Sequence, residues 1–553
     1  MKIYVIGASA TGLKAACRVK RLMPDWEIVV LDKGEYISYG ACGLPYYLSG
    51  DIDSIDDLMK TTFGVKRTPE FFWNAKGVEV NTGVIVEGID KSRKTLRIKD
   101  LRGNKNSEVA YDKLVIATGA NPEELILPGS ENEKVGYFKN LEDAMKLRGM
   151  LEKGNLGNVG IIGGGFIGCE LAEAFNSMWG SEVSLFESHN QLLPAFLDPE
   201  MSDILQEYLK NEGIDLHINY KIISFEEIDD KIAINTENGG QFTFDRVVIS
   251  VGVKPEANLA KQSGLEIGAL GGICVNEYLQ TSEPDIYAGG DCVENSNLIT
   301  GKPVYTPMGS LANKHGRIIG SNLAGLNEKF NPVIFSFGVK VFDFNISATG
   351  LTEKAAKKDD IKVSSQWGTF TDSAEYYPES KNIHMKLLFD PDSREVLGFQ
   401  ALGTGDTVKR VDVIGSLIKK GRKIDDILDL EFAYAPPYGP PLDSLYSLAS
   451  AALNQLDYNV CNSNPFIDFN GFDVIVDVRM KEESQLRKID HPRVINIPLT
   501  EFRARVNEIP KNLSILVVCA KGSRSAETAL FLNKSGYKNV KYLGGGLLMR
   551  PAN

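Results

Sequence analysis

The pattern of apolar and polar positions divides the chain into alternating strands and helices. Near the N-terminus, an apolar run at 2–6 leads into a glycine-containing turn, a segment with helical spacing at 13–22 and a second apolar run at 27–33. The same order recurs later, with apolar runs at 158–164 and 182–187. A strand, a tight turn, a helix and a parallel strand open a dinucleotide-binding βαβ unit. The sequence therefore predicts two such units in one chain, which is an internal repeat.

Two further segments indicate how these units are joined. Residues 111–122 and 244–259 each contain an apolar strand, a glycine-containing turn and a proline. We interpret them as paired crossing points between two nucleotide-binding domains.

Towards the C-terminus the pattern changes twice. Residues 382–390 and 395–403 alternate polar and apolar positions, as strands with one buried face do, and helical spacing follows them. The polar stretch 456–466 has the composition of a linker. A last strand–helix pattern begins near residue 467. We therefore predict a separate α+β domain, a linker and a final α/β domain.

Composition narrows the class of protein. The chain has 553 residues, too many for one core, and its 43% apolar and 24% charged residues are ordinary for a globular protein. A net charge of −12 argues against nucleic acid or anionic membrane as a general partner. Its seven cysteines are odd in number and lack metal-site spacing, so we expect no metal and no disulfide framework. The first apolar run, Ile3 to Gly7, is short and leads into a glycine turn, so we expect no targeting segment and a cytoplasmic location.

The turn after the first strand carries two of the three glycines of a dinucleotide fingerprint. Gly7 permits the tight turn and Gly12 permits close packing of helix on strand, whereas Ser9 replaces the middle glycine. Asp32 ends the second strand, where its carboxylate can accept ribose hydroxyls. A glycine-rich turn without a ligand is the alternative.

Two later motifs favour FAD at this first turn. Thr118 and Gly119 close a strand, and Asp291, in the sequence AGGDC, can bond a ribityl hydroxyl. Asp291 can also cap the N-terminus of a helix, and both roles are compatible.

The second turn has the full fingerprint. Gly163, Gly165 and Gly168 stand between a strand and a helix, where the helix N-terminus can hold a pyrophosphate. Glu187 ends the following strand, where a carboxylate accepts the ribose 2′-hydroxyl and repels a 2′-phosphate. We therefore predict NADH, rather than NADPH, at this turn. A solvated charge at the strand end is the alternative for Glu187.

Cys42 is the candidate redox residue. It lies in SYGACGLP, and Pro45 suits the first turn of a helix, so Cys42 would lie at a helix N-terminus, where the dipole favours the thiolate. A dithiol reductase would have its second thiol at the position of Tyr47. Cys42 must therefore pair with an external thiol, a bound sulfur or oxygen. A buried structural cysteine is the alternative.

The last domain offers a second sulfur site. Cys519 and Arg524 bracket a short loop between a strand and a helix. Successive N–H groups in such a loop form an anion nest, which would stabilise a persulfide on Cys519. Four residues separate Cys519 from Arg524, one fewer than in the wider phosphate-binding loop of related phosphatases.

These motifs together resemble a known family. The order GxSxxG, SYGACGLP, ATGA, GGGFIG, AGGDC and AYAPP is similar to the coenzyme A-disulfide reductases, flavoproteins with a single redox cysteine. The tail, with Cys519-x-x-Gly-x-Arg-Ser, resembles the rhodanese domain of reductase–rhodanese fusions, including NADH-dependent persulfide reductases. The segment after AYAPP departs from the family, in which it lies near the dimer interface and the substrate entrance.

The resemblance implies an α/β fold with two Rossmann-like domains that bind FAD and NAD, an α+β dimerisation domain and a rhodanese-like domain. The expected ranges are 1–117 with 248–328 for FAD, 118–247 for NAD(P)H, 329–455 for dimerisation, 456–465 for the linker and 466–553 for the rhodanese-like domain. It also implies a homodimer in which Tyr377, or its neighbour Tyr376, and Tyr434 reach the partner's redox cysteine. A packed interface tyrosine is the alternative for each.

The candidate residues follow from the motifs and the resemblance. Catalytic candidates are Cys42, Cys519, Tyr377, Tyr434 and Arg524. Candidates for FAD are Gly7, Ser9, Gly12, Asp32, Lys33, Ser38, Thr118, Gly119 and Asp291, and those for NADH are Gly163, Gly165, Phe166, Ile167, Gly168 and Glu187. Candidates for coenzyme A are Arg18, Arg21, Ser38 and Tyr39, with Lys20 beside them, although a solvated helix face would explain these cations equally well.

The expected activity is reduction of a sulfur–sulfur bond. Per- or polysulfide is favoured over coenzyme A disulfide, because a sulfur carrier fused to a reductase raises the effective concentration of sulfane sulfur. Two other functions stay open. An NADH oxidase or peroxidase would cycle Cys42 through a sulfenate, and a redox or sulfur sensor would use the same cysteines without turnover.

Overall fold

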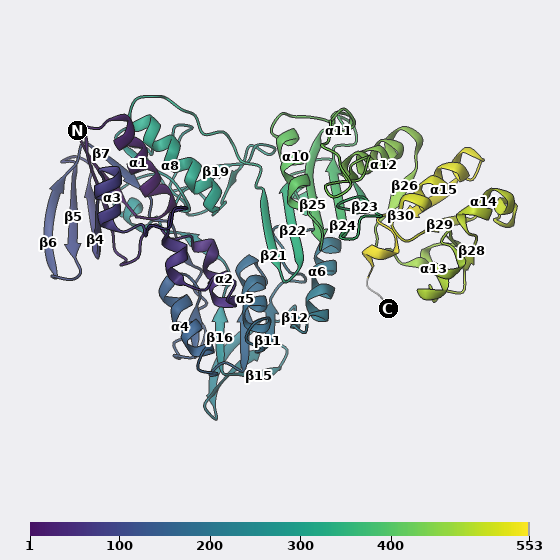
Figure 1. The fold of residues 1–553 in the computed structure, drawn as a ribbon, viewed down its shortest axis with the longest axis horizontal. Coiled ribbons are helices and arrows are strands. Elements are labelled where there is room, and N and C mark those ends of the chain that lie inside the picture. Colours follow the sequence, from purple (N-terminus) through teal and green to yellow (C-terminus); the bar gives the residue numbers. More distant parts are fainter. Residues whose placement is uncertain (551–553) are drawn as a thin grey trace. The chain divides into compact units, whose positions relative to one another are not determined.

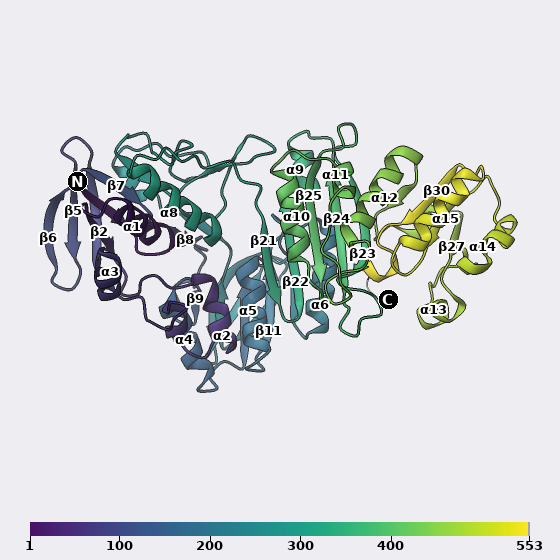
Figure 2. The same cartoon turned by 45° about the horizontal axis from the view of Figure 1, so that its top comes forward.

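The computed structural model describes residues 1–550 of the chain. It divides into two compact units, which Figures 1 and 2 show as ribbons coloured along the sequence. The first unit comprises Met1–Ser188 and Asn219–Val333, and the second comprises His189–Ile218 together with the chain from Ile334 onward. Within the described residues, no helix has both the length and the apolar character needed to cross a membrane.

The first unit begins with a parallel sheet. Its strands are, in spatial order, β18 (Ile286–Ala288), β7 (Lys113–Ile116), β1 (Lys2–Ile6), β2 (Glu27–Asp32) and β3 (Glu79–Thr82). The helices beside it are α1 (Ala10–Leu22), α3 (Pro69–Lys76) and α8 (Gly309–Leu323), and α1 and α8 run side by side (Figures 1 and 2).

Both faces of this sheet are buried. Ile3 and Val5 pack in a cluster with α1 and α8, whereas Tyr4 and Ile6 pack with the antiparallel layer of β4 (Val84–Asp90), β5 (Thr95–Asp100) and β6 (Lys105–Ala110). A parallel strand buried on both faces needs apolar residues throughout, and this explains the continuous apolar run at 2–6.

The second parallel sheet of this unit corresponds to the repeated motif. Its strands include, in spatial order, β11 (Glu182–Glu187), β10 (Asn158–Ile162), β16 (Arg246–Ile249) and β9 (Val135–Tyr137). The helices of this part are α4 (Leu141–Leu151) and α5 (Phe166–Asn176). A separate antiparallel layer consists of β13 (Ile222–Ile228), β14 (Lys231–Thr236) and β15 (Gln241–Phe244). The expected crossing points pair with each other as the antiparallel strands β8 (Ala120–Pro122) and β17 (Val253–Pro255), which confirms that prediction.

The second unit contains an antiparallel sheet. Its spatial order, visible in Figure 2, is β21 (Phe337–Val341), β22 (Phe344–Gly350), β25 (Val396–Gly403), β24 (Asn382–Phe389) and β23 (Ser364–Thr371). Helices of this unit are α6 (Pro199–Asn211), α9 (Glu353–Lys358), α10 (Val408–Ile418), α11 (Ile424–Leu428) and α12 (Ser444–Tyr458).

A buried ion cluster ties the start of α6 to this sheet. The side chain of Lys386, on β24, is completely buried, and its Nζ lies 2.9 Å from carboxylate oxygens of Asp198 and of Glu353. Removing one partner would leave an uncompensated buried charge, so the cluster fixes which elements lie together.

The C-terminal part of the second unit is a parallel sheet. Its order is β26 (Cys461–Ser463), β30 (Asn539–Leu543), β29 (Ser514–Val518), β27 (Val474–Asp477) and β28 (Val494–Asn496), and its helices are α13 (Lys481–Leu486), α14 (Leu499–Arg505) and α15 (Ser523–Lys534).

The segment expected to be a linker is ordered instead. Helix α12 continues to Tyr458, and residues 461–463 form β26, which pairs with β30. Its polar side chains are hydrogen-bonded within the protein: the amide of Asn462 donates to the carbonyl of Ser365 at 3.1 Å and to Gln366 Oε1 at 3.0 Å. Polar composition suggested a solvated connection, whereas the side-chain N–H groups of Asn462 are hydrogen-bonded within the protein.

Candidate functional site

The first glycine turn is shaped for a close approach of the backbone to a ligand. Gly7 has φ +106°, and a Cβ there would overlap the carbonyl oxygen of Ala117, while a Cβ at Gly12 would overlap that of Gly7. Ser9 precedes α1 without capping it through its side chain. The Asp32 carboxylate accepts hydrogen bonds from Ala8 N at 2.6 Å and from Gly34 N at 2.8 Å. The turn and the acid therefore hold each other in the geometry that a dinucleotide needs.

The other FAD candidates surround this turn. Ser38 has φ +54°, and its N–H donates to the carbonyl of Ala8 at 2.9 Å, which brings the Cys42 segment to the turn. Lys33 is exposed just after β2. Thr118 Oγ1 donates to the carbonyl of Glu256 at 2.5 Å, and Gly119 follows with φ +74°.

Asp291 lies half-buried after β18, and burial raises the pKa of its carboxyl to about 6. No helix begins there, because α8 starts at Gly309, so the helix-capping alternative is wrong. The preceding Gly290 N–H donates to Nδ1 of the buried His315 at 3.0 Å, which orients this turn. A partly desolvated carboxyl at this place suits a hydrogen bond to a sugar-like hydroxyl.

The second turn repeats the same geometry. Gly163 has φ +110°, and a Cβ at Gly168 would overlap its carbonyl oxygen. A Cβ at Gly165, the residue before α5, would meet nothing within 4 Å, so open space lies at this helix N-terminus. Glu187 is buried and accepts a hydrogen bond from Gly164 N at 2.8 Å, so a freely solvated charge is the wrong description. Phe166 and Ile167 form the first turn of α5. These residues fit a pyrophosphate and its ribose.

Cys42 lies in a short 3₁₀ turn, Ala41–Gly43, that leads directly into α2 (Leu44–Ser49), with Pro45 in the first turn of α2 as expected. Its side chain is exposed, so the alternative of a buried structural cysteine is wrong. A Cβ built at Gly309 would lie 3.8 Å from the Cys42 sulfur, which places the start of α8 beside the thiol. A reactive sulfur is thus presented at a surface framed by elements of the first unit.

The expected lowering of the Cys42 pKa is not what the protein groups produce. Neighbouring atoms remove part of the water around the thiol, and this desolvation raises its pKa, with further contributions from the carboxylates of Glu170 and Asp291. Desolvation and the two acidic groups therefore oppose the dipole of the short helix α2. A backbone hydrogen bond at Cys42 lowers its pKa, but this contribution is smaller than those that raise it.

The position of a second redox thiol is occupied by a fixed tyrosine. Arg148 lies 5.3 Å from the ring centroid of Tyr47 and donates to the Tyr47 carbonyl at 2.6 Å. Trp179 Nε1 donates to the next carbonyl, that of Leu48, at 2.8 Å. The side chains of Arg148 and Trp179 therefore hold the C-terminal end of α2 by hydrogen bonds to its carbonyl groups. All seven cysteines are free thiols, so Cys42 has no disulfide partner in its own chain.

Sequence reasoning missed Glu170, which lies two residues after the second fingerprint. Burial raises the pKa of its carboxyl to about 7, and the charge of Glu173 adds to this effect. Its charge acts on both Cys42 and Tyr46, because α5 packs against α2. An acidic residue on the turn after a fingerprint was the available signal, but only packing shows that it faces the redox cysteine.

Replacing Glu170 by glutamine should make Cys42 easier to ionise. In the native state the carboxylate forms near pH 7, whereas in the unfolded chain it forms near 4.5, so stability is lost as pH rises through this window. In the Glu170→Gln variant, the pH inflection of Cys42 alkylation should therefore lie lower than in wild type. Its melting temperature should be higher than that of wild type above pH 7 but not below pH 4.5. Glu182→Gln is the matched control, because Glu182 is an exposed carboxylate on β11 and is not among the groups that shift the Cys42 pKa. An unchanged Cys42 inflection in Glu170→Gln would contradict the electrostatic assignment.

The coenzyme A candidates differ in their surroundings. Arg18 Nε donates to Ser321 Oγ at 3.1 Å, and Arg21 is exposed. Lys20 is used locally, because its Nζ donates to the carbonyls of Pro24 and Trp26. Burial raises the pKa of Tyr39 to about 12, so its phenol stays protonated. Among these candidate cations, Arg18 and Arg21 thus remain available to a ligand.

The candidate tyrosines lie in the second unit. The N–H of Ala374 donates to the carbonyl of Pro436 at 3.0 Å, which joins the two tyrosine segments. The Tyr376 and Tyr434 side chains share a hydrogen bond that raises the pKa of Tyr434. Both are largely exposed, at 75% and 49%, whereas Tyr377 is half-buried. The structure therefore brings the two segments together into one exposed tyrosine surface.

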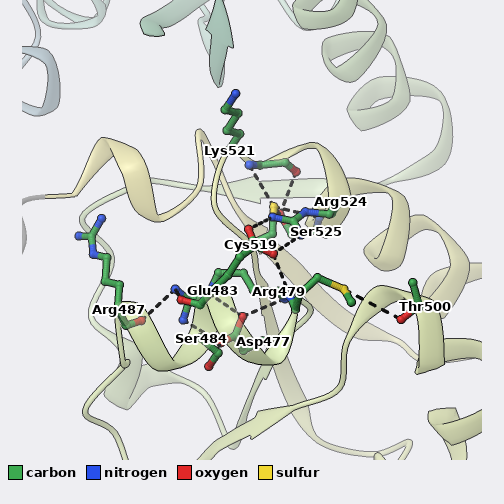
Figure 3. A network of polar contacts seen from close by, with 12 residues as sticks. Asp477, Arg479, Glu483, Ser484, Arg487, Thr500, Cys519, Lys521, Arg524 and Ser525 are labelled. Atoms are coloured by element: carbon green, nitrogen blue, oxygen red, sulfur yellow. Dashed lines mark hydrogen bonds and ion pairs between the residues drawn. The ribbon is translucent and has the colours of Figure 1, made fainter. Parts of the chain in front are cut away.

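The Cys519 loop forms the expected nest. Figure 3 shows the fully buried Cys519 among converging polar groups. Its sulfur accepts from the N–H groups of Gly522, at 3.1 Å, and Ser525, at 3.4 Å. Gly522 has φ +100°, a left-handed conformation that only glycine adopts readily, and this turns its N–H toward the sulfur. Backbone donors at this spacing can stabilise a thiolate or persulfide anion.

Arg524 is held by a carboxylate beside the nest. Its two terminal nitrogens each lie 2.7 Å from an oxygen of Glu483, and this bidentate pair lowers the pKa of Glu483 to about 2. Below it, the buried Arg479 is paired in the same way with Asp477 (Figure 3). The cation near Cys519 is therefore fixed in place and partly neutralised.

Two dinucleotide turns and a lone exposed cysteine beside them are typical of a flavin- and pyridine nucleotide-dependent reductase, and a second cysteine lies in an anion nest of a separate C-terminal sheet. The chain belongs to the pyridine nucleotide-disulphide oxidoreductase family, whose model matches residues 1–308. The dimerisation domain of that family matches residues 336–444, and a rhodanese-like domain matches residues 467–548. Within the family, the chain is an NAD(P)H-dependent flavoprotein reductase of the group that includes coenzyme A-disulfide and persulfide reductases.

Similar proteins span the whole chain. The structure of a NAD-dependent persulfide reductase from A. fulgidus is 40% identical, covers 100% of both chains and superposes with a TM-score of 0.96. The reduced CoADR-RHD of Bacillus anthracis is 34% identical, covers 99% of this chain and 97% of its own, and has a TM-score of 0.92. An NAD(P)H coenzyme A polysulfide/persulfide reductase of Pyrococcus horikoshii is 34% identical over 81% of this chain and 97% of its own length.

Proposed function

We propose that this protein uses NADH to reduce persulfides or polysulfides, and that it also reduces coenzyme A disulfide as a second substrate. The observation that carries the proposal is an exposed Cys42 without a thiol partner in a chain that also holds Cys519 in an anion nest. Relatives whose names include persulfide reductase and coenzyme A disulfide reductase support it. A disulfide substrate alone would leave the Cys519 nest without a role.

The family implies FAD and NAD(P)H as cofactors. Gly7, Gly12 and Asp32 would hold FAD at the first turn, and Gly165 and Glu187 would hold the pyridine nucleotide at the second. Bound FAD would supply two-electron chemistry between the nicotinamide and the sulfur at Cys42. The Glu187 carboxylate would repel a 2′-phosphate, which favours NADH.

Cys42 would carry the substrate sulfur. Its thiolate attacks the sulfur–sulfur bond of a persulfide, forms a bond to one sulfur and releases the other half as a thiolate or as sulfide. Addition of two electrons and a proton to the new bond releases the second half and restores Cys42. Glu170 would remain protonated below about pH 7 and so limit the negative charge beside this thiolate.

The remaining assignments concern coenzyme A, the dimer and the location. The guanidinium groups of Arg18 and Arg21 would bind coenzyme A phosphates, with Ser38 and Tyr39 near the thiol end.

The match to the dimerisation domain suggests a homodimer. In it, Tyr377 and Tyr434 would donate protons to thiolates leaving the partner's redox cysteine. The expected domain boundaries and the cytoplasmic location stay part of this proposal.

Cys519 would carry sulfane sulfur. Its thiolate attacks a donor persulfide, takes the terminal sulfur as a Cys519 persulfide and releases the donor thiolate. A thiol acceptor such as coenzyme A then takes that sulfur and becomes the persulfide substrate of Cys42. Arg524 would stabilise the anionic forms from beside the nest.

The decisive experiment compares acceptors with the purified holoenzyme. NADH oxidation and sulfide release are measured with coenzyme A persulfide, coenzyme A disulfide, oxygen and peroxide, and then repeated with NADPH. We expect the highest kcat/KM with the persulfide, one sulfide released per NADH oxidised, and at least about tenfold preference for NADH over NADPH. Faster turnover with oxygen or peroxide would replace the proposal by an oxidase or peroxidase, and flavin reduction without any turnover would indicate a sensor.

A further inference from the structure

The outer strand of the antiparallel sheet lies against the C-terminal sheet. In the spatial order of its sheet, β23 is an edge strand, yet its four central residues, 366–369, are buried. Gln366 Nε2 donates to the hydroxyl of Tyr542 at 2.9 Å, and both side chains are almost completely buried. Buried polar pairs of this kind require a defined geometry, because each group loses water when the surfaces meet. The two sheets are therefore docked in one arrangement.

A run of three glycines forms the contact between β23 and the last sheet. The hydroxyl of Thr369, a residue that is 2% exposed, donates to the carbonyl of Gly545 at 2.7 Å. A Cβ at Gly544 would lie 3.2 Å from the ring of Trp367. Gly545 and Gly546 have φ values of +68° and +70°. The glycine turn 544–546 thus fits under the side chains of β23, and its conformation depends on glycine.

The other side of the glycine turn supports the Cys519 loop. A Cβ at Gly546 would overlap the carbonyl of Ala520, and one at Gly522 would lie 3.2 Å from Gly545 N. The N–H of Leu547 donates to the carbonyl of Cys519 at 2.9 Å. The loop that bears the sulfur therefore rests directly on the turn that Thr369 holds.

Thr369 also reaches the loop itself. Its backbone N–H donates to the carbonyl of Lys521 at 3.4 Å, and the Lys521 side chain points away from Cys519 (Figure 3) to Glu375, with Nζ 2.5 Å from the carboxylate. Glu375 is exposed, so this ion pair adds little stability. The buried hydroxyl of Thr369 is the stronger link, because a polar hydrogen bond that is shielded from water is costly to break.

We propose that Thr369, from the dimerisation domain, is a positioning residue for Cys519. It holds Gly545, Gly545 abuts Gly522, and the Gly522 N–H is the donor nearest the Cys519 sulfur. A shift of the glycine turn would move this donor and weaken the stabilisation of the Cys519 thiolate. The inference rests on the proposed sulfur-carrier role. It extends that role, because a residue of the dimerisation domain would help to position the sulfur site of the rhodanese-like domain.

Thr369→Val tests the inference, because valine keeps the shape and removes the hydroxyl. In the full-length holoenzyme, alkylation of Cys519 by iodoacetamide is followed by peptide mass spectrometry between pH 5 and 10. We expect alkylation at pH 7 to slow about fivefold, the pH inflection to rise and sulfur transfer through Cys519 to fall by a similar factor. Reduction of a small persulfide through Cys42 should not change.

Two variants complete the experiment. Thr369→Ser keeps the hydroxyl and should show the wild-type pH inflection of Cys519 alkylation. If the valine variant folds poorly, the serine variant still tests whether the hydroxyl is sufficient. Thr500→Val is the matched control, because Thr500 is exposed and its hydroxyl donates to the Met480 sulfur, at 4.0 Å, rather than to the Cys519 loop. Identical Cys519 inflections in wild type and Thr369→Val, or in Thr369→Val and Thr369→Ser, would overturn the inference. A wild type that gains no sulfur at Cys519 would instead refute the sulfur-carrier role.

Discussion

Cys42→Ser is expected to abolish NADH-dependent reduction of both coenzyme A persulfide and coenzyme A disulfide, with a loss of at least about 1,000-fold in kcat/KM. The reason is that Cys42 alone forms the mixed disulfide in the proposed chemistry: Tyr47 takes the position of a second redox cysteine, and Cys42 is a free thiol. Serine keeps the size of the side chain, but its hydroxyl is a far weaker nucleophile at neutral pH. Steady-state NADH oxidation and sulfide release measure the effect.

The control for this variant is Cys274→Ser, which removes a half-buried thiol elsewhere in the first unit. Both variants should retain bound flavin and the wild-type rate of flavin reduction by NADH, because the two glycine turns are unchanged. Residual persulfide reduction above a few per cent in Cys42→Ser would show that electrons reach substrate without this sulfur, and the proposed chemistry would then be wrong.

Cys519→Ser is expected to separate the two sulfur sites. Transfer of sulfane sulfur from a bulk donor to coenzyme A should fall by about 100-fold or more, because the nest formed by Gly522 and Ser525 N–H groups has no persulfide to stabilise. Reduction of a small persulfide added directly should stay within about twofold of wild type, because Cys42 lies in the other unit. Coupled assays with a polysulfide donor and with preformed coenzyme A persulfide distinguish the two effects.

Cys461→Ser is the matched control, since Cys461 is a half-buried thiol on β26 of the same sheet. It should retain sulfur transfer. Loss of transfer in this variant would assign Cys461 a relay role, and equal loss of small-persulfide reduction in the Cys42 and Cys519 variants would contradict the division of labour between the two sites.

Much of the fold could be predicted because local patterns determine it. A continuous apolar run that ends in glycine, such as 158–164, predicts a buried parallel strand and the turn after it, and β10 and α5 confirm this. The alternation at 382–390 likewise appears as β24. The order of the segment 456–465 could not be predicted, because polar composition does not reveal whether a polar group faces water or a hydrogen-bond partner such as Gln366.

The candidate residues followed from the motifs and from the family resemblance, and their roles stay predictions until the variants are measured. The sequence by itself determined the two nucleotide turns, the lone Cys42 and the Cys519 loop, because each is encoded within a few consecutive residues. Only the tertiary structure decided that Glu170 faces Cys42, that Arg148 and Trp179 hold α2, and that Thr369 supports the Cys519 loop. These contacts join residues far apart along the chain, and the free energy of such a contact depends on how separate elements pack, which no local pattern records.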